Sequence, residues 1–383
     1  RYEEAERSAR EAIGRSGASD YLDELHYELG WILAALGKKD EALAEFAWLE
    51  TGSRDANITA SALCKAGDIY IDAKKYKEAL ANYDTVLDKH QSSRWADYAQ
   101  YRVGDIFLFT DKLDEAILAY QNVLSNYPAS RMREKALFQL GSVYLRKKDY
   151  GPAAARFRMM LSEYPDSKAR AEADLCLGSA LFNAGDHEGA IEASRKAAES
   201  GPEKVKEMAA YQIARAYYGM KKDDDAAREF SAFLKQYPGS DLVPDVWFWF
   251  GEYYISKGKF EKAGESFNAI LKSSAAGDIR ERALFALAAS KYDEKDLSGS
   301  IEKLDQFLKE FPESKVRGKA LAKAAAISKS MGDMDRAVWY LKNALTTENN
   351  ESNAQIQYEI AEAIEAKGMT GEAAEEYLKV PYV

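Results

Sequence analysis

The chain has 383 residues and a formal net charge of −10, from 53 Lys and Arg against 63 Asp and Glu. This acidic balance argues against a nucleic-acid backbone or an anionic membrane surface as the main partner. No apolar run approaches the roughly 18 residues that a membrane-spanning helix needs, so the sequence predicts no direct membrane span.

Residues 1–16 carry one amphipathic helical pattern, and ten copies of a longer pattern follow. The copies begin near residues 19, 56, 93, 130, 167, 203, 240, 277, 314 and 350. Self-similarity at a fixed period is typical of repeat proteins. Each copy has a small residue that we call the anchor, and successive anchors lie 36 or 37 residues apart: Gly30, Gly67, Gly104, Gly141, Gly178, Ala214, Gly251, Ala288, Ala325 and Ala361.

A second small residue follows each anchor by twelve positions, and in nine copies a larger apolar residue comes four positions later. In the third copy these residues are Gly104, Ala116 and Tyr120, whereas Ser194 replaces the larger residue in the fifth copy. Two small positions on separate apolar stripes predict two antiparallel helices, A and B, in close contact where the side chains are small.

The phrase Tyr-Pro-x-Ser, as at residues 127–130, separates several copies. Pro128 cannot continue the preceding helix, and Ser130 is expected to be the N-cap of the next helix A. Eight of the ten residues at this position are good N-caps; the ten are Ser19, Ala56, Ser93, Ser130, Ser167, Glu203, Ser240, Gly277, Ser314 and Asn350.

This pattern resembles the tetratricopeptide repeat, a helix-turn-helix unit, along the whole chain. The resemblance implies an all-α fold: one right-handed superhelical solenoid over residues 1–383, with ten repeats after a leading helix B at residues 1–16. The copies exceed the usual 34 residues, and we expect the chain to be a fragment of a longer protein. The Tyr-Pro-x-Ser phrase resembles bacterial envelope members of the Tol-Pal coordinator and outer-membrane β-barrel assembly lipoprotein type. That likeness implies a periplasmic location, with a cytoplasmic one as the alternative.

In the family that the chain resembles, helices A line a concave groove. The groove-facing positions lie three before, one after and four after each anchor. Tyrosine and tryptophan on a rigid concave surface dominate binding hot spots. The predicted partner-binding residues at and near these positions are Tyr27, Trp31, Tyr98, Tyr101, Phe109, Phe138, Tyr211, Tyr218, Phe248, Trp249, Phe285 and Tyr292.

A structural alternative stays open, because some of these rings must pack between neighbouring helices A. If Tyr101 and Phe248 face the groove, replacing both by alanine leaves the helical circular dichroism intact and abolishes capture of the partner. Loss of the fold instead would show that the two rings belong to the core.

Charged positions add two expectations. The ninth repeat replaces aromatics by Lys319, Lys323 and Lys329, which either bind an acidic segment or pair with Glu359, Glu362 and Glu365 on the next helix A; the sequence favours pairing. The position after the anchor holds no asparagine, so the carboxylate clamp of chaperone-tail adaptors is not expected.

Catalysis needs convergent groups, and none is predicted. His26, His90 and His187 have no Cys or His at metal-ligand spacing, and Cys64 and Cys176 lie too far apart in the array for a disulfide. We therefore predict a non-enzymatic scaffold, without cofactor or metal, that binds a protein or peptide in the groove. An accessory array of a larger enzyme or secretion machine, and a self-assembly module, are the alternatives; the sequence leaves the oligomeric state open.

Overall fold

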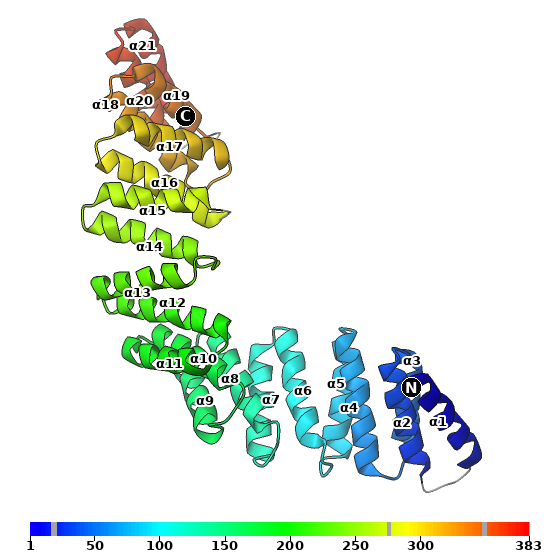
Figure 1. The fold of residues 1–383 in the computed structure, drawn as a ribbon. Helices are drawn as coiled ribbons and strands as arrows, with labels where there is room; N and C mark the ends of the chain where they lie inside the picture. Colours follow the sequence, from blue (N-terminus) through cyan, green and yellow to red (C-terminus); the bar gives the residue numbers. More distant parts are fainter. Residues whose placement is uncertain (17–20, 274–276, 347–350, 383) are drawn as a thin grey trace. The chain divides into compact units, whose positions relative to one another are not determined.

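The computed structural model describes residues 1–16, 21–273, 277–346 and 351–382, and these ranges contain 21 α-helices and no strand (Figure 1). The leading helix is α1 (Tyr2–Ser16) and a short 3-10 turn, η1 (Val380–Tyr382), comes last. Helices A are α2 (Leu22–Ala35), α4 (Ala56–Asp72), α6 (Ala96–Phe109), α8 (Arg133–Arg146), α10 (Arg170–Asn183), α12 (Glu203–Gly219), α14 (Val243–Ser256), α16 (Asp278–Asp293), α18 (Arg317–Ser330) and α20 (Glu351–Ala366).

Helices B alternate with helices A, which confirms the predicted all-α fold of ten helix pairs behind one leading helix. They are α3 (Lys39–Gly52), α5 (Tyr76–Lys89), α7 (Leu113–Asn126), α9 (Tyr150–Glu163), α11 (His187–Ser200), α13 (Asp223–Gln236), α15 (Phe260–Lys272), α17 (Leu297–Glu310), α19 (Met334–Ala344) and α21 (Thr370–Lys379).

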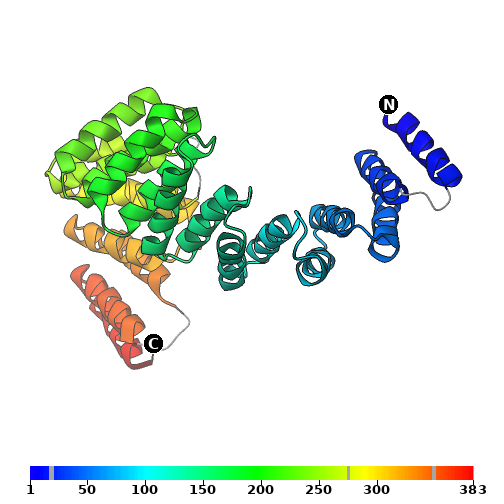
Figure 2. The ribbon, with the colours of Figure 1, turned by 90° about the horizontal axis from the view of Figure 1, so that it is seen from below.

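The chain forms two compact units, Arg1–Lys221 (unit 1) and Lys222–Val383 (unit 2), and the boundary lies in the turn between α12 and α13. Within each unit, helix B packs against the helix A of the next repeat, as α3 does against α4 and α15 against α16. Successive helices A also touch, as in the pairs α4–α6 and α14–α16 (Figure 1, Figure 2). Continuity of one solenoid across the two units stays a prediction.

The anchor glycines let a large helix B side chain lie directly on the backbone of helix A. A Cβ atom built on Gly104 would lie 2.5 Å from the Tyr120 ring, and one on Gly251 would lie 2.3 Å from the Phe267 ring. The same approach occurs at Gly30, Gly67 and Gly141. Because these rings are fully buried, the small anchor is a packing requirement, and the spacing of sixteen residues between anchor and ring fixes the register of the two helices.

In the fifth repeat, polar side chains replace the contact between ring and anchor. Ser194 stands where the other repeats have a ring, and its Oγ donates to Oε1 of Gln212 at 2.7 Å. The Gln212 side chain in turn donates to Ser179 Oγ on α10. Ser194 itself is fully buried, so the hydrogen bonds compensate for removing its hydroxyl from water.

The predicted N-cap role of Ser130 is wrong, because α8 begins three residues later with Met132 as its N-cap. The Tyr-Pro phrase forms a separate turn, in which Ser130 Oγ accepts from the Met132 N–H at 2.8 Å and donates to the Asp97 carboxylate on α6 at 2.6 Å. Ser314 bonds Glu281 in the same way at 2.6 Å. The serine therefore links consecutive helices A.

Most of the other residues predicted to be N-caps differ in position from the observed N-caps of helices A. The helix N-cap also lies two residues after Ser93, Ser167, Ser240 and Ser314, and one residue before Ala56 and Glu203. Gly277 is the N-cap of α16, as predicted. Ser19 and Asn350 lie outside the described residues.

Gly104→Ala should lower the free energy of unfolding by about 1–3 kcal/mol, because the new methyl group would overlap the Tyr120 ring. Gly151→Ala is the matched control, since a Cβ on this helical glycine meets nothing within 4 Å. The control should be neutral or stabilising. Urea denaturation followed by circular dichroism measures both, and equal effects at the two glycines would contradict the packing role of the anchor.

Candidate interaction surface

The rings three positions before the anchor pack against the helix B of their own repeat. Ring centroids lie 6.2 Å apart for Tyr27 and Phe46, and 5.7 Å apart for Phe138 and Phe157. The corresponding pairs Tyr101–Tyr120 and Phe248–Phe267 lie at 5.6 and 5.5 Å, and Phe285 lies 5.6 Å from Phe307. Each pair closes over the anchor, so these rings hold helices A and B together.

Three of the predicted binding residues are buried: Tyr101, Phe248 and Trp249 each keep 8% of their surface exposed. Tyr27, Tyr98, Phe138, Tyr211 and Phe285 are half-buried. For the buried residues the structure supports the core alternative that the sequence left open. A ring with so little free surface has little area to offer a partner.

Four predicted residues are exposed, and three of them lie either one or four residues after an anchor. Trp31 follows its anchor by one residue and is 41% exposed; Tyr218 and Tyr292 follow theirs by four and are 51% and 39% exposed. Phe109 is 53% exposed but lies at the end of α6, with its ring 6.1 Å from Tyr76 on α5. We call the side of helices A that carries the positions six, three and two before the anchors and one and four after them the A face.

On the described parts of helices A, one exposed ring was missing from the predicted set. Tyr358 on α20 lies three positions before its anchor and is 44% exposed, although its ring is 5.4 Å from Tyr377. The sequence could have indicated Tyr358, because Tyr27 and Tyr101 were predicted from the same position in the repeat.

A polar network occupies the A face between α4 and α6 in unit 1. The hydroxyl of Tyr98 donates to both carboxylate oxygens of Asp68 at 2.8 Å, and Tyr83 donates to the same carboxylate at 2.7 Å. Arg102 binds Asp68 through Nε at 3.0 Å and Asp105 through Nη1 at 2.9 Å. Tyr98 therefore already has partners within the chain.

In the second and third repeats the network provides an acceptor for the hydroxyl of a helix B tyrosine. Asp105 follows its anchor directly and accepts from Tyr120 at 2.7 Å, as Asp68 does from Tyr83. Burial raises the pKa of Asp105 above its usual range, although the bonds from Tyr120 and Arg102 act in the opposite direction. Where Ser142 follows the anchor, the ring is Phe157, which needs no hydroxyl partner.

A cleft of about 830 Å³ opens in unit 1 at the turns that precede α6 and α8. Trp95 and Tyr98 form one side, and Tyr127, Pro128 and Met132 form the other. Tyr98 is the only predicted binding residue that lines it. A smaller recess of about 210 Å³ lies beside Trp31, on the A face itself.

In unit 2 the A face carries cations on aromatic rings. The guanidinium carbon of Arg282 lies 4.1 Å from the centroid of the Phe248 ring, and Nζ of Lys323 lies 5.4 Å from that of Tyr292. Of the pairings predicted for the ninth repeat, the structure confirms that between Lys329 and Glu359, at 3.2 Å. Lys319 and Lys323 have no carboxylate partner among the described residues.

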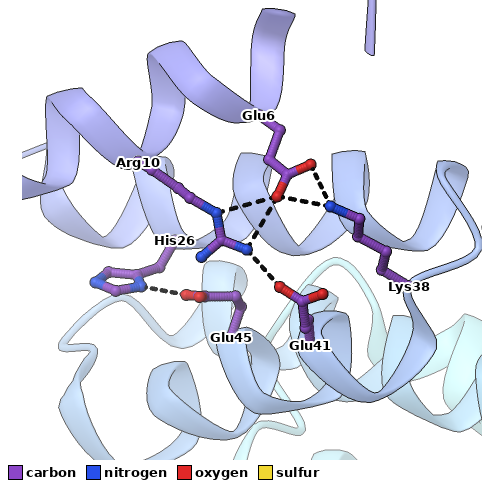
Figure 3. Close-up of polar contacts among 6 residues, drawn as sticks. All are labelled: Glu6, Arg10, His26, Lys38, Glu41 and Glu45. Carbon is purple, nitrogen blue, oxygen red and sulfur yellow. Dashed lines mark hydrogen bonds and ion pairs between the residues drawn. The ribbon is translucent and has the colours of Figure 1, made fainter. Parts of the chain in front are cut away.

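The leading helix is joined to the first repeat by a cluster of charges (Figure 3). Glu6 on α1 accepts from Arg10 at 3.1 Å and from Lys38 at 2.8 Å, and the bond from Lys38 lowers the pKa of Glu6. Arg10 also donates to Glu41 on α3 at 2.5 Å. These contacts tie α1 to the first A–B turn and to helix B.

His26 is part of this packing. Its Nδ1 lies 2.6 Å from Glu45 (Figure 3). Its ring stacks on Trp48 with the centroids 3.8 Å apart. Within the ranges that the structure describes, no three His, Cys, Asp or Glu residues converge as metal ligands, and no helix is long and apolar enough to cross a membrane. Cys64 and Cys176 are free thiols, and burial raises the pKa of Cys176 to about 11.

Comparison with known proteins agrees with this geometry. A family model for a tetratricopeptide repeat-like domain matches residues 2–144, and tetratricopeptide repeat models match residues 135–167, 211–278 and 282–314. The matches lie in both units and together cover most of the chain. The helical repeats thus define a solenoid-type interaction protein, and the chain belongs to the tetratricopeptide repeat family.

Solved structures give the same fold. The C-terminal part of a TPR repeat-containing protein from Cytophaga hutchinsonii is 18% identical over 68% of this chain and 99% of its own, with a TM-score of 0.56. A tetratricopeptide repeat protein from Parabacteroides merdae is 16% identical, with coverages of 69% and 98% and a TM-score of 0.44. MamA is 25% identical, with coverages of 44% and 93% and a TM-score of 0.39. At these values the first shows a shared fold alone. No curated protein sequence matches the chain significantly.

The buried rings give a prediction opposite to the one made from the sequence. Tyr101→Ala and Phe248→Ala should each lower the free energy of unfolding by about 3 kcal/mol or more, because each leaves a cavity against a helix B ring. Trp31→Ala should cost clearly less, since Trp31 is 41% exposed and its ring contacts Tyr2, which is itself exposed, on α1. Chemical denaturation of the three variants measures this, and equal losses at Trp31 and Tyr101 would contradict the division into core and surface rings.

Proposed function

We propose that the protein is a non-enzymatic scaffold that binds a protein segment on its A face. The observation that carries the proposal is the exposure of Trp31 and Tyr218 on helices A whose other rings, such as Tyr27 and Tyr211, are half-buried. Such rings offer a large apolar area together with a polar edge, and little conformational entropy is lost on binding.

Rigidity supports the same proposal. The glycine anchors hold helix B rings against helices A, as at Gly30 and Phe46 beside Trp31. A preorganised surface loses less free energy on binding than a mobile one. Binding of protein partners is also the activity typical of tetratricopeptide repeats.

We also propose a bacterial cell-envelope setting, in the periplasm. The support is the Tyr-Pro-x-Ser phrase, which the structure places in the inter-repeat turns, as at Tyr127 and Ser130. This setting rests on resemblance, and the accessory-array and self-assembly alternatives stay predictions.

Peptides selected on the wild-type chain from a phage-displayed library test the binding proposal. Their affinity, measured by fluorescence polarisation, should fall by roughly tenfold or more in the variant Trp31→Ala with Tyr218→Ala, because hot-spot rings contribute about 2 kcal/mol each. Far-ultraviolet circular dichroism should be unchanged, since both rings are exposed.

The matched control is Leu118→Ala with Trp339→Ala. These two residues are 60% and 55% exposed but lie on helices B. If the control weakens binding as much as the A-face variant, or if no peptide is enriched, the proposed function is wrong.

A further inference from the structure

Three cations lie on the A face of unit 2: Arg282 on α16, and Lys319 and Lys323 on α18. Arg282 and Lys319 are exposed, and none of the three has a carboxylate partner among the residues that the structure describes.

Their positions in the repeat place them on one surface. Arg282 and Lys319 both lie six residues before their anchors, and Lys323 lies one helical turn after Lys319. Arg282 reaches the Phe248 ring on α14, and Lys323 reaches the Tyr292 ring on α16. Both rings occupy A-face positions, so the cations face the same side of the helices.

Unit 1 shows one contact that a cation at the Lys323 position can make. Arg102 lies two residues before its anchor, as Lys323 does, and binds Asp68 at 3.0 Å. Asp68 directly follows the anchor of the preceding helix A. The equivalent residue in front of Lys323 is Ala289 on α16, so the carboxylate that completes this contact in unit 1 is missing.

Alanine at this position is confined to this part of the array. The residue after the anchor is acidic in four repeats, at Asp68, Asp105, Glu252 and Glu362, but is Ala289 and Ala326 in the eighth and ninth. The side chains of Ala289 and Ala326 are short, and the exposed Tyr292 ring lies three residues after Ala289 on α16. The neighbouring Lys329 is already paired with Glu359.

We propose that this face binds an acidic segment of a partner protein, with an Asp or Glu side chain seated over Ala289 and bound by Lys323. Arg282 and Lys319 flank that carboxylate and receive further acidic residues. The inference rests on the proposed function, since it assigns the chemistry of the partner that the A face takes in unit 2. Its charged contacts weaken as salt is added.

The test uses the whole chain and a fluorescein-labelled peptide of alternating Glu and Ala. The same peptide with Gln in place of Glu is the neutral probe. Wild type should bind the Glu peptide more tightly than the Gln peptide, and the difference should shrink at high salt. Equal affinities would overturn the inference.

Ala289→Asp is the decisive variant, because it supplies the missing carboxylate from within the chain. It should weaken binding of the Glu peptide about fivefold or more. Asn has the same shape as Asp and a similar helix propensity but no charge, so Ala289→Asn should bind the peptide within about twofold of wild type. Equal losses in the two variants would show that shape and not charge is responsible, and would overturn the inference.

Removal of the cations gives an independent comparison. Lys319→Ala with Lys323→Ala should also weaken the Glu peptide about fivefold, while Lys272→Ala with Lys309→Ala, exposed lysines on helices B, should not. Preferential binding of an oligothymidylate strand would point to nucleic acid and would contradict the proposal. Trp31 and Tyr218 lie in unit 1, whereas the three cations lie in unit 2. The experiment with Trp31 and Tyr218 can therefore support the proposed function even if the acidic-peptide experiment overturns this inference.

Discussion

The approach of a helix B ring to a helix A backbone is the contact on which the other features of each repeat depend. It requires a residue without a side chain at the anchor, as the 2.5 Å distance at Gly104 shows. A second ring on helix A, such as Tyr101, then packs against the helix B ring. Trp31, Tyr218 and Tyr292 lie one or four residues after their anchors and are 39–51% exposed. Phe182, at the same repeat position as Tyr218, is half-buried against the core. The contact at the anchor thus accounts for the structural rings.

The same contact organises the polar groups. A helix B ring that bears a hydroxyl needs an acceptor at its far end, and Asp68 and Asp105 provide it. The carboxylates then attract Arg102, which lies between them. In the eighth and ninth repeats the rings are replaced by Leu304 and Leu341, and the acceptors by Ala289 and Ala326. Cations that remain on that face are therefore left for an external partner.

Much of the fold could be predicted from the sequence, because a period of 37 residues with two small positions leaves few helical arrangements. The choice among the aromatic residues could not be predicted. Positions three before and one after the anchor lie on the same side of helix A, but Phe248 packs against the Phe267 ring of helix B and is buried, whereas Trp31 is 41% exposed. The role of Ser130 as a link between helices A could not be predicted either, because its turn precedes the helix and its partner Asp97 is 33 residues away in the sequence.

Hydroxyl-radical footprinting with mass spectrometry tests this division of the rings most directly, because oxidation rates follow the exposure of individual side chains. Trp31, Tyr218 and Tyr292 should be oxidised rapidly, and Tyr101, Phe138 and Phe248 slowly, in the folded protein. After denaturation the two groups should differ only by their intrinsic reactivities. Rapid oxidation of Tyr101 and Phe248 in the folded chain would contradict the account.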